Sequence, residues 1–261
     1  MQVGHTDTFG GRLLTGPPAY RPATPWQAAP ALLVTALIVA AGMAAMAGVM
    51  LLVDLTVPLS SDAGADLAAV IGPRLWALAA MQAVAVVLTL WAGRGFGGRL
   101  RDVLTLRGAP AGWRAYAGAL LAMAGLQAVL AGVQHFVLRH DVLTDVRPLV
   151  GVVTGSHWPL AAAVMAVGAP LSEELLFRGF LLGALAKARL GFAGAALVST
   201  GAWTALHPGY SLMGLVDVFA NGLLFCWLLW RTGSLWVPLL CHAAYNGLIV
   251  LALLFAVKWL A

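Results

Sequence analysis

The sequence predicts an all-α protein, a polytopic bundle of transmembrane helices built as a single membrane domain. Hydrophobic residues make up 61% of the 261 positions and charged residues only 10%, whereas soluble domains carry about a quarter charged residues. The apolar residues gather in runs near the ~20 residues that a helix needs to cross a bilayer. These runs are unbroken, and a transmembrane β-barrel would instead alternate polar and apolar residues in short segments. A soluble protein and a membrane barrel are therefore both disfavoured.

The N-terminal 29 residues differ from the rest of the chain in composition. They are polar and rich in glycine and proline, with pairs at Gly10-Gly11 and Pro17-Pro18. Such a stretch predicts a flexible tail. It lacks the early apolar core of a cleavable signal peptide, so we expect the first membrane helix to act as the targeting signal. Residues 30–261 are predicted to form the single transmembrane domain.

Seven apolar segments follow the tail, and each is predicted to be a membrane helix. The fourth is long enough to be tilted or to project from the membrane. An eighth helix is an alternative, either as a short surface or re-entrant segment over residues 56–72 or through a break of the last run after Pro238. The predicted spans are 30–53, 75–93, 113–136, 158–186, 191–208, 212–230 and 235–257.

The positive charges predict the orientation, because Lys and Arg are retained in cytoplasmic loops. With a cytoplasmic N-terminus, ten of the fifteen basic residues fall in inner loops and four in outer loops, while Arg178 stays within a helix. Residues 94–114 carry five of them; we interpret this loop as a topology determinant, with a basic amphipathic segment on lipid head groups as the alternative. The net charge of +5 is spread over short loops, so no nucleic-acid partner is expected. The inner set is Arg12, Arg21, Arg94, Arg99, Arg101, Arg107, Arg114, Lys187, Arg189 and Arg231, and the outer set is Arg74, Arg139, Arg147 and Lys258.

The two cysteines, Cys226 and Cys241, both fall in apolar segments. Free cysteine is among the most buried residue types and packs as a small hydrophobe. We therefore expect two buried thiols and no structural disulfide, and we expect neither to be a reactive or metal-binding residue.

Two adjacent glutamates, Glu173 and Glu174, stand inside the fourth apolar segment. An ionisable residue at membrane depth is costly and indicates a functional site. Glu174 and Arg178 are four residues apart and share a helix face, so they can form a charge-assisted pair. Glu173 projects about 100° away and lacks a local cation; a desolvated carboxylate beside a second acid suits a general base. The alternative is a buried polar cluster that only fastens helices together. Pro170 precedes the pair and predicts a turn or kink, where Ser172 can satisfy freed backbone groups.

Polar residues on later segments could complete such a site. His242 and Asn246 lie four apart on one helix face, so both can point into one polar cavity; hydrogen bonding between helices is the alternative. His207 ends the fifth segment, where a histidine is more often interfacial than catalytic. Asp217 is predicted either to line the same cavity, with Asn221 along its face, or to mark a loop boundary. The remaining histidines are expected in the tail, at interfaces or in loops: His5, His135, His140 and His157.

Three motifs occur in order on separate apolar segments: Glu173-Glu174-x-x-x-Arg178, Trp203-x-x-x-His207 and His242-x-x-x-Asn246. Together they resemble the CAAX-protease and bacteriocin-processing family of intramembrane endopeptidases (the CPBP, Abi or Rce1-like proteins). The resemblance covers about residues 158–250, the expected catalytic core, and the first three helices match only in being apolar. The second motif usually begins with phenylalanine, and the tryptophan at this position is expected to affect local packing only.

The resemblance implies peptide-bond hydrolysis with water as the nucleophile. Glu173 would deprotonate the water, His207 would help to hold it, and His242 with Asn246 would stabilise the oxyanion. Glu174 and Arg178 would support these residues. Metal dependence stays open: Glu173, His207 and His242 could supply a His₂Glu zinc set, and the same residues could act without metal, which we favour.

The leading hypothesis is therefore an intramembrane endopeptidase of a bacterial inner membrane, with a cytoplasmic N-terminus and a membrane-associated protein or peptide as substrate. One alternative keeps the fold without catalysis, as a membrane scaffold or immunity protein. Another is a small proton-coupled transporter that uses the acids as relays. The chain has no evident internal repeat of the kind that builds transporter sites, which weakens this last alternative.

Overall fold

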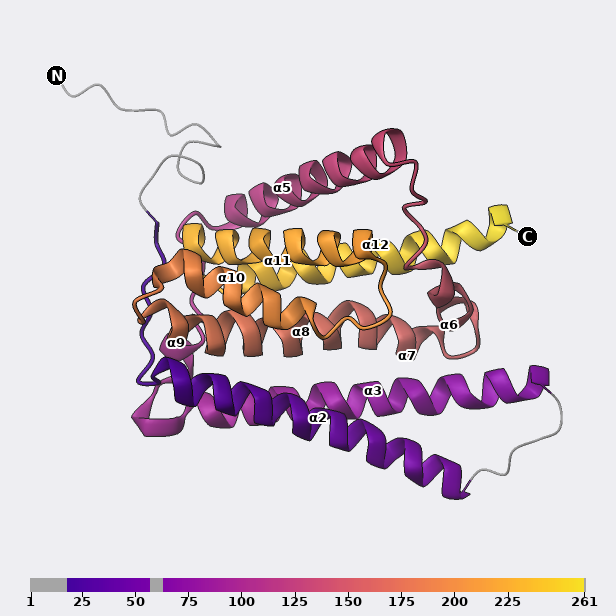
Figure 1. Ribbon diagram of the computed structural model, residues 1–261, viewed down its shortest axis with the longest axis horizontal. Coiled ribbons are helices and arrows are strands. Elements are labelled where there is room, and N and C mark those ends of the chain that lie inside the picture. The colour runs from indigo at the N-terminus through magenta and orange to yellow at the C-terminus, as the bar shows by residue number, and fades with distance from the viewer. Residues whose placement is uncertain (1–17, 57–62, 261) are drawn as a thin grey trace.

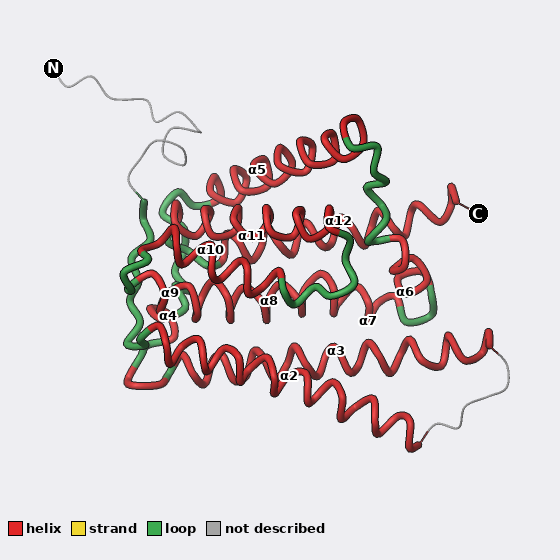
Figure 2. The backbone as a smooth tube through the Cα atoms, in the orientation of Figure 1, coloured by secondary structure: helices red, strands yellow, loops and turns green. Residues whose placement is uncertain are grey.

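The computed structural model describes residues 18–56 and 63–260, and in this part of the chain the regular structure is entirely helical. Figure 1 shows long helices running roughly parallel or antiparallel to one another, with α2 and α3 side by side at one edge. Figure 2 shows that the loops gather at the two ends of the bundle and at one place inside it. The prediction of an all-α polytopic bundle is confirmed.

Six helical stretches are long and apolar enough to cross a membrane. They lie in α2 (Ala28–Thr56), α3 (Ala63–Gly93), α5 (Trp113–Gly132, continued by a π turn to Val137), the composite helix Trp158–Ala186, α11 (Leu212–Thr232) and α12 (Trp236–Leu260).

The fifth predicted span, 191–208, forms a shorter helix than expected. α10 (Gly191–Thr204) has 14 residues and so rises only ~21 Å, less than the ~30 Å hydrocarbon core of a bilayer. The indole of Trp203, near its end, contacts Glu173 in the middle of the composite helix. The loop that follows α10 therefore begins at membrane depth, where irregular backbone is tolerated only inside protein or along a wet cavity.

The composite helix contains two π-helical segments between its α-helical parts. It consists of α7 (Trp158–Ala163), a π segment η4 (Val164–Gly168), α8 (Ala169–Glu173), a second π segment η5 (Glu174–Leu181) and α9 (Leu182–Ala186). Every residue of η5 is buried. π turns are uncommon in helices, but those that do occur often lie at functional sites.

Neither alternative for an eighth helix forms within the described residues. Residues from Ala63 onward join α3, and residues 57–62 lie outside the part described. α12 continues through Pro238, which stands in its first turn, where a missing N–H breaks no helical hydrogen bond. Short helical turns occupy the loop before the composite helix, at η3 (Arg147–Leu149) and α6 (Val150–Thr154).

Part of the predicted flexible tail is packed against the bundle. Residues 1–17 lie outside the described part, but Tyr20 and Thr24 are buried, and burial raises the pKa of the Tyr20 phenol. The backbone N–H of Tyr20 donates to the carbonyl of Trp230 at 3.1 Å, and Lys187 Nζ donates to the carbonyl of Thr24 at 2.5 Å. Gly233, with φ +62°, leaves room for residues 18–27, because a Cβ there would lie 2.9 Å from the carbonyl oxygen of Ala19.

The basic loop 94–112 also packs against this end of the bundle. It contains only the short helices η1 (Gly95–Gly97) and α4 (Leu100–Val103), and Leu104 is fully buried. The backbone N–H of Leu235 donates to the carbonyl of Thr105 at 3.0 Å. The loop is therefore held against the bundle, and its role as a topology determinant or as a segment on lipid head groups stays a prediction.

The two cysteines are free and buried, as predicted. Cys226 lies 3.5 Å from the hydroxyl of Thr200, and Cys241 Sγ donates to the carbonyl of Ala119 at 3.5 Å. Both thiols therefore pack inside the bundle and pair with neighbouring helices.

Candidate active site

The two adjacent glutamates occupy different environments. The Glu174 side chain is fully buried and accepts a hydrogen bond from Arg178 Nη1 at 3.1 Å, the pair that the four-residue spacing predicts. The Glu173 side chain is 25% exposed, so it alone of the two can meet water or a substrate. A buried carboxylate and a buried guanidinium neutralise each other, whereas Glu173 keeps no cation of this kind.

His242 joins the two glutamates from α12. Its Nδ1 lies 3.0 Å from Glu174 Oε1, and its Nε2 lies 3.9 Å from Glu173 Oε2. Since Glu174 accepts at Nδ1, that nitrogen carries the proton, and the second nitrogen faces Glu173. A separation of 3.9 Å is longer than a direct hydrogen bond, so these two atoms face each other without a direct hydrogen bond.

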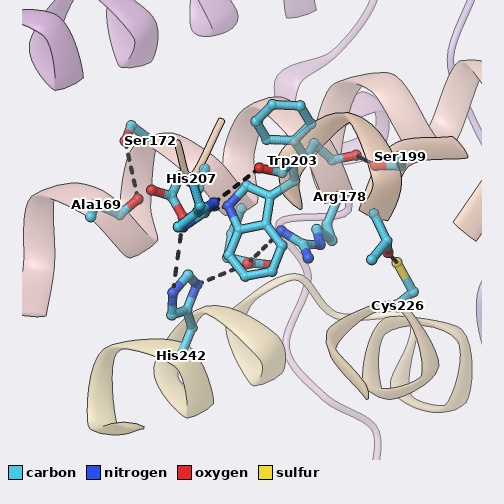
Figure 3. Close-up of polar contacts among 12 residues, drawn as sticks. Ala169, Ser172, Arg178, Ser199, Trp203, His207, Cys226 and His242 are labelled. Carbon is cyan, nitrogen blue, oxygen red and sulfur yellow. Dashed lines mark hydrogen bonds and ion pairs between the residues drawn. The ribbon is translucent and has the colours of Figure 1, made fainter. Parts of the chain in front are cut away.

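Trp203 contacts four of the site residues: Glu173, Arg178, His207 and His242. Its indole Nε1 donates to Glu173 Oε2 at 2.6 Å, and its ring lies beneath the guanidinium of Arg178, with Cζ 4.2 Å from the ring centroid. The His207 ring packs edge-on against the indole at 5.1 Å, and its Nδ1 lies 3.1 Å from the Trp203 carbonyl. Figure 3 shows Trp203 between Arg178, His207 and His242. The structure therefore corrects the expectation that tryptophan here affects packing only.

Asn246 lies further along α12 than the cluster around His242. Its Nδ2 donates to the carbonyl of Met165 at 2.9 Å, at the point where η4 winds as a π helix. The N–H of Ala169 bonds the carbonyl of Val164 in this register, so the N–H of residue 170 would bond Met165. Residue 170 is proline and has no N–H. Asn246 therefore donates to the Met165 carbonyl, which lacks its helical donor because residue 170 is proline.

Other side chains also donate hydrogen bonds to backbone carbonyls in the irregular part of the composite helix. Ser172 Oγ donates to the carbonyl of Ala169 at 3.0 Å, consistent with its predicted role beside the proline. From α3, Gln82 Nε2 donates to the carbonyl of Val164 at 3.2 Å. A Cβ at Gly168 would lie 2.1 Å from Gln82 Oε1, so the glycine lets the two helices approach. The sequence showed no sign of Gln82, which lies on a helix outside the three motifs.

The three residues proposed as zinc ligands do not converge. Among the residues that the structure describes, no three His, Cys, Asp or Glu side chains are grouped closely enough to hold a metal ion. His242 turns Nδ1 toward Glu174, and His207 turns Nδ1 toward a backbone carbonyl. Each of these contacts leaves Nε2 free, as in a histidine that binds metal, so metal-free action stays a prediction that is based on the spacing of the three side chains.

Asp217 belongs to a second polar cluster between α5, α11 and α12. Gln127 Nε2 donates to Asp217 Oδ1 at 3.2 Å and to Asn221 Oδ1 at 2.9 Å. The Tyr245 hydroxyl lies 3.2 Å from both Gln127 Oε1 and Asp217 Oδ2. Asp217 and Asn221 are thus neighbours, as predicted, but their direct partners are neutral residues and not the glutamates. Gln127 and Tyr245 are uncharged, so composition and charge did not point to them.

The loop after α10 brings an aromatic residue close to the site. The Tyr210 ring packs edge-on against His207 at 5.4 Å. Burial raises the pKa of the Tyr210 phenol, and the negative charge of Glu173 raises it further. The loop is held by Asp145, which accepts from both the N–H and the hydroxyl of Ser211 at 2.7 Å. Ser211 in turn caps α11 through the N–H of Gly214.

Comparison with known proteins adds independent evidence for the motif-bearing half. Residues 155–248 match the family model described as "Type II CAAX prenyl endopeptidase Rce1-like". This segment is similar to the Rce1-like family. It contains all six predicted site residues, and the resemblance inferred from the three motifs is confirmed over it.

A curated relative points in the same direction. Over 101 residues the chain is 34% identical to the Bacillus subtilis (strain 168) protein named "Putative membrane peptidase YdiL". The aligned part is 38% of this chain and 40% of that protein, so it spans less than half of either. No solved structure matches the chain significantly. The Rce1-like segment comprises the composite helix, α10, α11 and about half of α12, while α2, α3 and α5 lie outside it.

Proposed function

We propose that this protein is an intramembrane endopeptidase of the CAAX-protease type, with Glu173 as the general base. One observation carries the proposal: at membrane depth, in an Rce1-like segment, a partly exposed carboxylate is held between the Trp203 indole N–H and His242 Nε2. A structural carboxylate of a membrane bundle is expected to be buried and neutralised, as Glu174 is. Glu173 has the opposite properties, and these suit a base that must receive a proton from water.

The site residues divide the work by their contacts. A water between Glu173 and His242 would lose a proton to the carboxylate and attack the scissile carbonyl. The tetrahedral intermediate would then break its C–N bond, and the protonated Glu173 would return the proton to the leaving amine. Glu174 fixes the His242 tautomer and is itself held by Arg178, so these two residues act through the histidine. His207 stands beside the Trp203 ring and would orient the water or the substrate.

Asn246 can still take part in oxyanion stabilisation. A carboxamide has two N–H donors, and the hydrogen bond to Met165 uses one of them. The second N–H would bind the tetrahedral oxyanion, and His242 would join it when Nε2 is also protonated, because only the imidazolium donates from both nitrogens; donors of this kind act where water is excluded.

The substrate proposed is a peptide bond close to the membrane, because Glu173 lies near the middle of a helix of 29 residues. The proposed location is a bacterial inner membrane with a cytoplasmic N-terminus. In agreement with that orientation, residues 18–27, loop 94–112 and the turn between α11 and α12 all lie at one end of the bundle, on the left of Figure 1.

The test compares the termini of membrane proteins by mass spectrometry in cells that carry wild-type protein or Glu173→Ala. We expect a set of new N-termini that requires Glu173, and cleavage of the corresponding peptides by purified wild-type protein in detergent or bicelles. Asp141→Asn, in an exposed loop, is the matched control and should cleave normally. If Glu173→Ala cleaved a verified substrate as fast as wild type, the proposed mechanism would be wrong. If Glu173→Gln restored every cellular phenotype of a deletion, a non-catalytic role would replace it.

A further inference from the structure

The hydrogen bond between Trp203 and Glu173 is unusual for its length and its chemistry. The indole Nε1 is 2.6 Å from Glu173 Oε2, shorter than the usual distance of about 2.9 Å for N–H to oxygen. Charged acceptors give short, strong hydrogen bonds. An indole can only donate, so the direction of this hydrogen bond is certain, and it acts on one of the two carboxylate oxygens.

The indole is held in place on several sides. Trp203 is only 3% exposed, with Arg178 over one face at 4.2 Å and the Phe225 ring 6.1 Å from its own. On α11, Gly222 leaves just enough space, since a Cβ there would lie 3.0 Å from Trp203 Cε3. Because packing fixes the ring, the N–H has a fixed direction, and so has the oxygen that it holds.

The residue type matters because phenylalanine, the usual residue at this position of the motif, would pack in a similar way but donate no hydrogen bond. In water the solvent could replace the missing donor; at membrane depth it is scarce. Trp203 therefore supplies the ionised Glu173 with a donor that the hydrocarbon cannot provide.

We propose that Trp203 is a positioning residue: its indole N–H holds Glu173 Oε2 and so fixes the direction of the carboxylate that takes the proton from water. The inference rests on the proposed peptidase function, and it adds a specific role for a side chain that the motif normally uses for packing. Trp203 is almost completely buried, so it would act through Glu173 and not on the substrate directly.

The first measurement detects the contact without any enzymatic assay. The chain has ten tryptophans, so protein labelled with ¹⁵N in its indoles gives up to ten N–H signals by NMR. Trp203→Phe identifies one signal by removing it. We expect that signal at the downfield end of the indole region, and we expect Glu173→Gln to move it upfield because the acceptor loses its charge. A signal that coincides with those of the lipid-facing tryptophans and does not move in Glu173→Gln would overturn the inference.

The second measurement tests the effect on the reaction. Hydrogen bonds to charged groups have a typical worth that corresponds to about 10- to 100-fold in rate. We expect Trp203→Phe to lower kcat by this factor with KM nearly unchanged, because the indole orients the base and does not bind the substrate. Trp91→Phe, on a side chain that is 75% exposed, is the matched control and should behave as wild type.

The outcomes separate the two proposals. If wild type cleaves substrate, Glu173→Ala does not, and Trp203→Phe matches wild type in kcat, the positioning role fails while the peptidase function stands. If purified wild type cleaves none of the peptides whose termini depend on Glu173 in cells, the proposed function fails and the positioning role fails with it. A Trp203→Phe variant that keeps its thermal stability and KM but loses kcat supports the inference.

Discussion

Replacing Asn246 with alanine tests whether this residue contributes to the stability of the fold, to catalysis or to both. The side chain donates to the Met165 carbonyl at 2.9 Å, and Pro170 is the reason why that carbonyl needs an outside donor. Pro170→Ala supplies a backbone N–H that can bond Met165 in the π register of η4. The pair of substitutions therefore separates the structural hydrogen bond from any catalytic one.

The two roles differ in magnitude. Hydrogen bonds between membrane helices average about 0.6 kcal/mol and reach about 1.7 kcal/mol. Since Met165 would be left without this donor, we expect Asn246→Ala to lower the free energy of unfolding by about 1 to 2 kcal/mol. Loss of an oxyanion donor costs about 100- to 1000-fold in kcat, or ~2.7 to 4 kcal/mol. The catalytic loss should therefore exceed the stability loss clearly.

The assay follows thermal unfolding in detergent and cleavage of a verified substrate for wild type, both single variants and the double variant. We expect Pro170→Ala to cancel most of the stability loss of Asn246→Ala and to restore none of the activity. Recovery of both in the double variant would refute the oxyanion role and leave Asn246 as a helix fastener. A stability loss that Pro170→Ala does not change would refute our account of the Met165 carbonyl.

Three further predictions concern the surroundings of the site. Gly222→Ala places a Cβ 2.5 Å from Thr200 Cγ2 and 2.9 Å from Arg178 Nη2, so overpacking should lower the free energy of unfolding by about 1 to 3 kcal/mol, measured by chemical or thermal unfolding. Gly125→Ala is the control, because a Cβ there has open space around it. Equal effects of the two substitutions would contradict this reasoning. Asp217→Asn should leave the free energy of unfolding within about 0.5 kcal/mol of wild type, because the new amide can donate to Tyr245 while Tyr245 donates to Gln127. Asp217→Ala removes these hydrogen bonds and should cost about 1 to 2 kcal/mol. Equal stabilities of the two variants would contradict this explanation. Treatment with EDTA or phenanthroline should leave cleavage unchanged, since the His and Glu side chains do not converge, and full loss that zinc restores would disprove it.

Sequence alone determined the elements of this protein to a large extent. Long apolar runs can be stable in a bilayer only as helices, because every backbone polar group must be satisfied inside the segment. The six membrane helices and the pair Glu174 and Arg178 follow from such local rules. Spacing along one helix also separated Glu173 from Glu174, and the structure gives them different exposure.

Local rules failed where a segment depends on its neighbours. α10 ends at Thr204, four residues before the end of its apolar run, because the chain turns into a loop whose residue Ser211 is held by Asp145 from another part of the sequence. Residues 18–27 are polar and rich in proline, yet Tyr20 is buried between helix ends that are distant in sequence. Hydrophobicity cannot reveal such contacts, because they depend on which ends come together.

The composition of the site shows the same division. Motif spacing identified Glu173, His207, His242 and Asn246 as polar residues at membrane depth, and the family resemblance assigned them a chemistry. Only the tertiary structure decided that Asn246 serves the carbonyl left free by Pro170, that Asp217 joins Gln127 and Tyr245, and that the Trp203 indole holds the proposed base. Periodicity fixes the face on which a side chain lies, whereas its hydrogen-bond partner depends on how closely the facing helices approach.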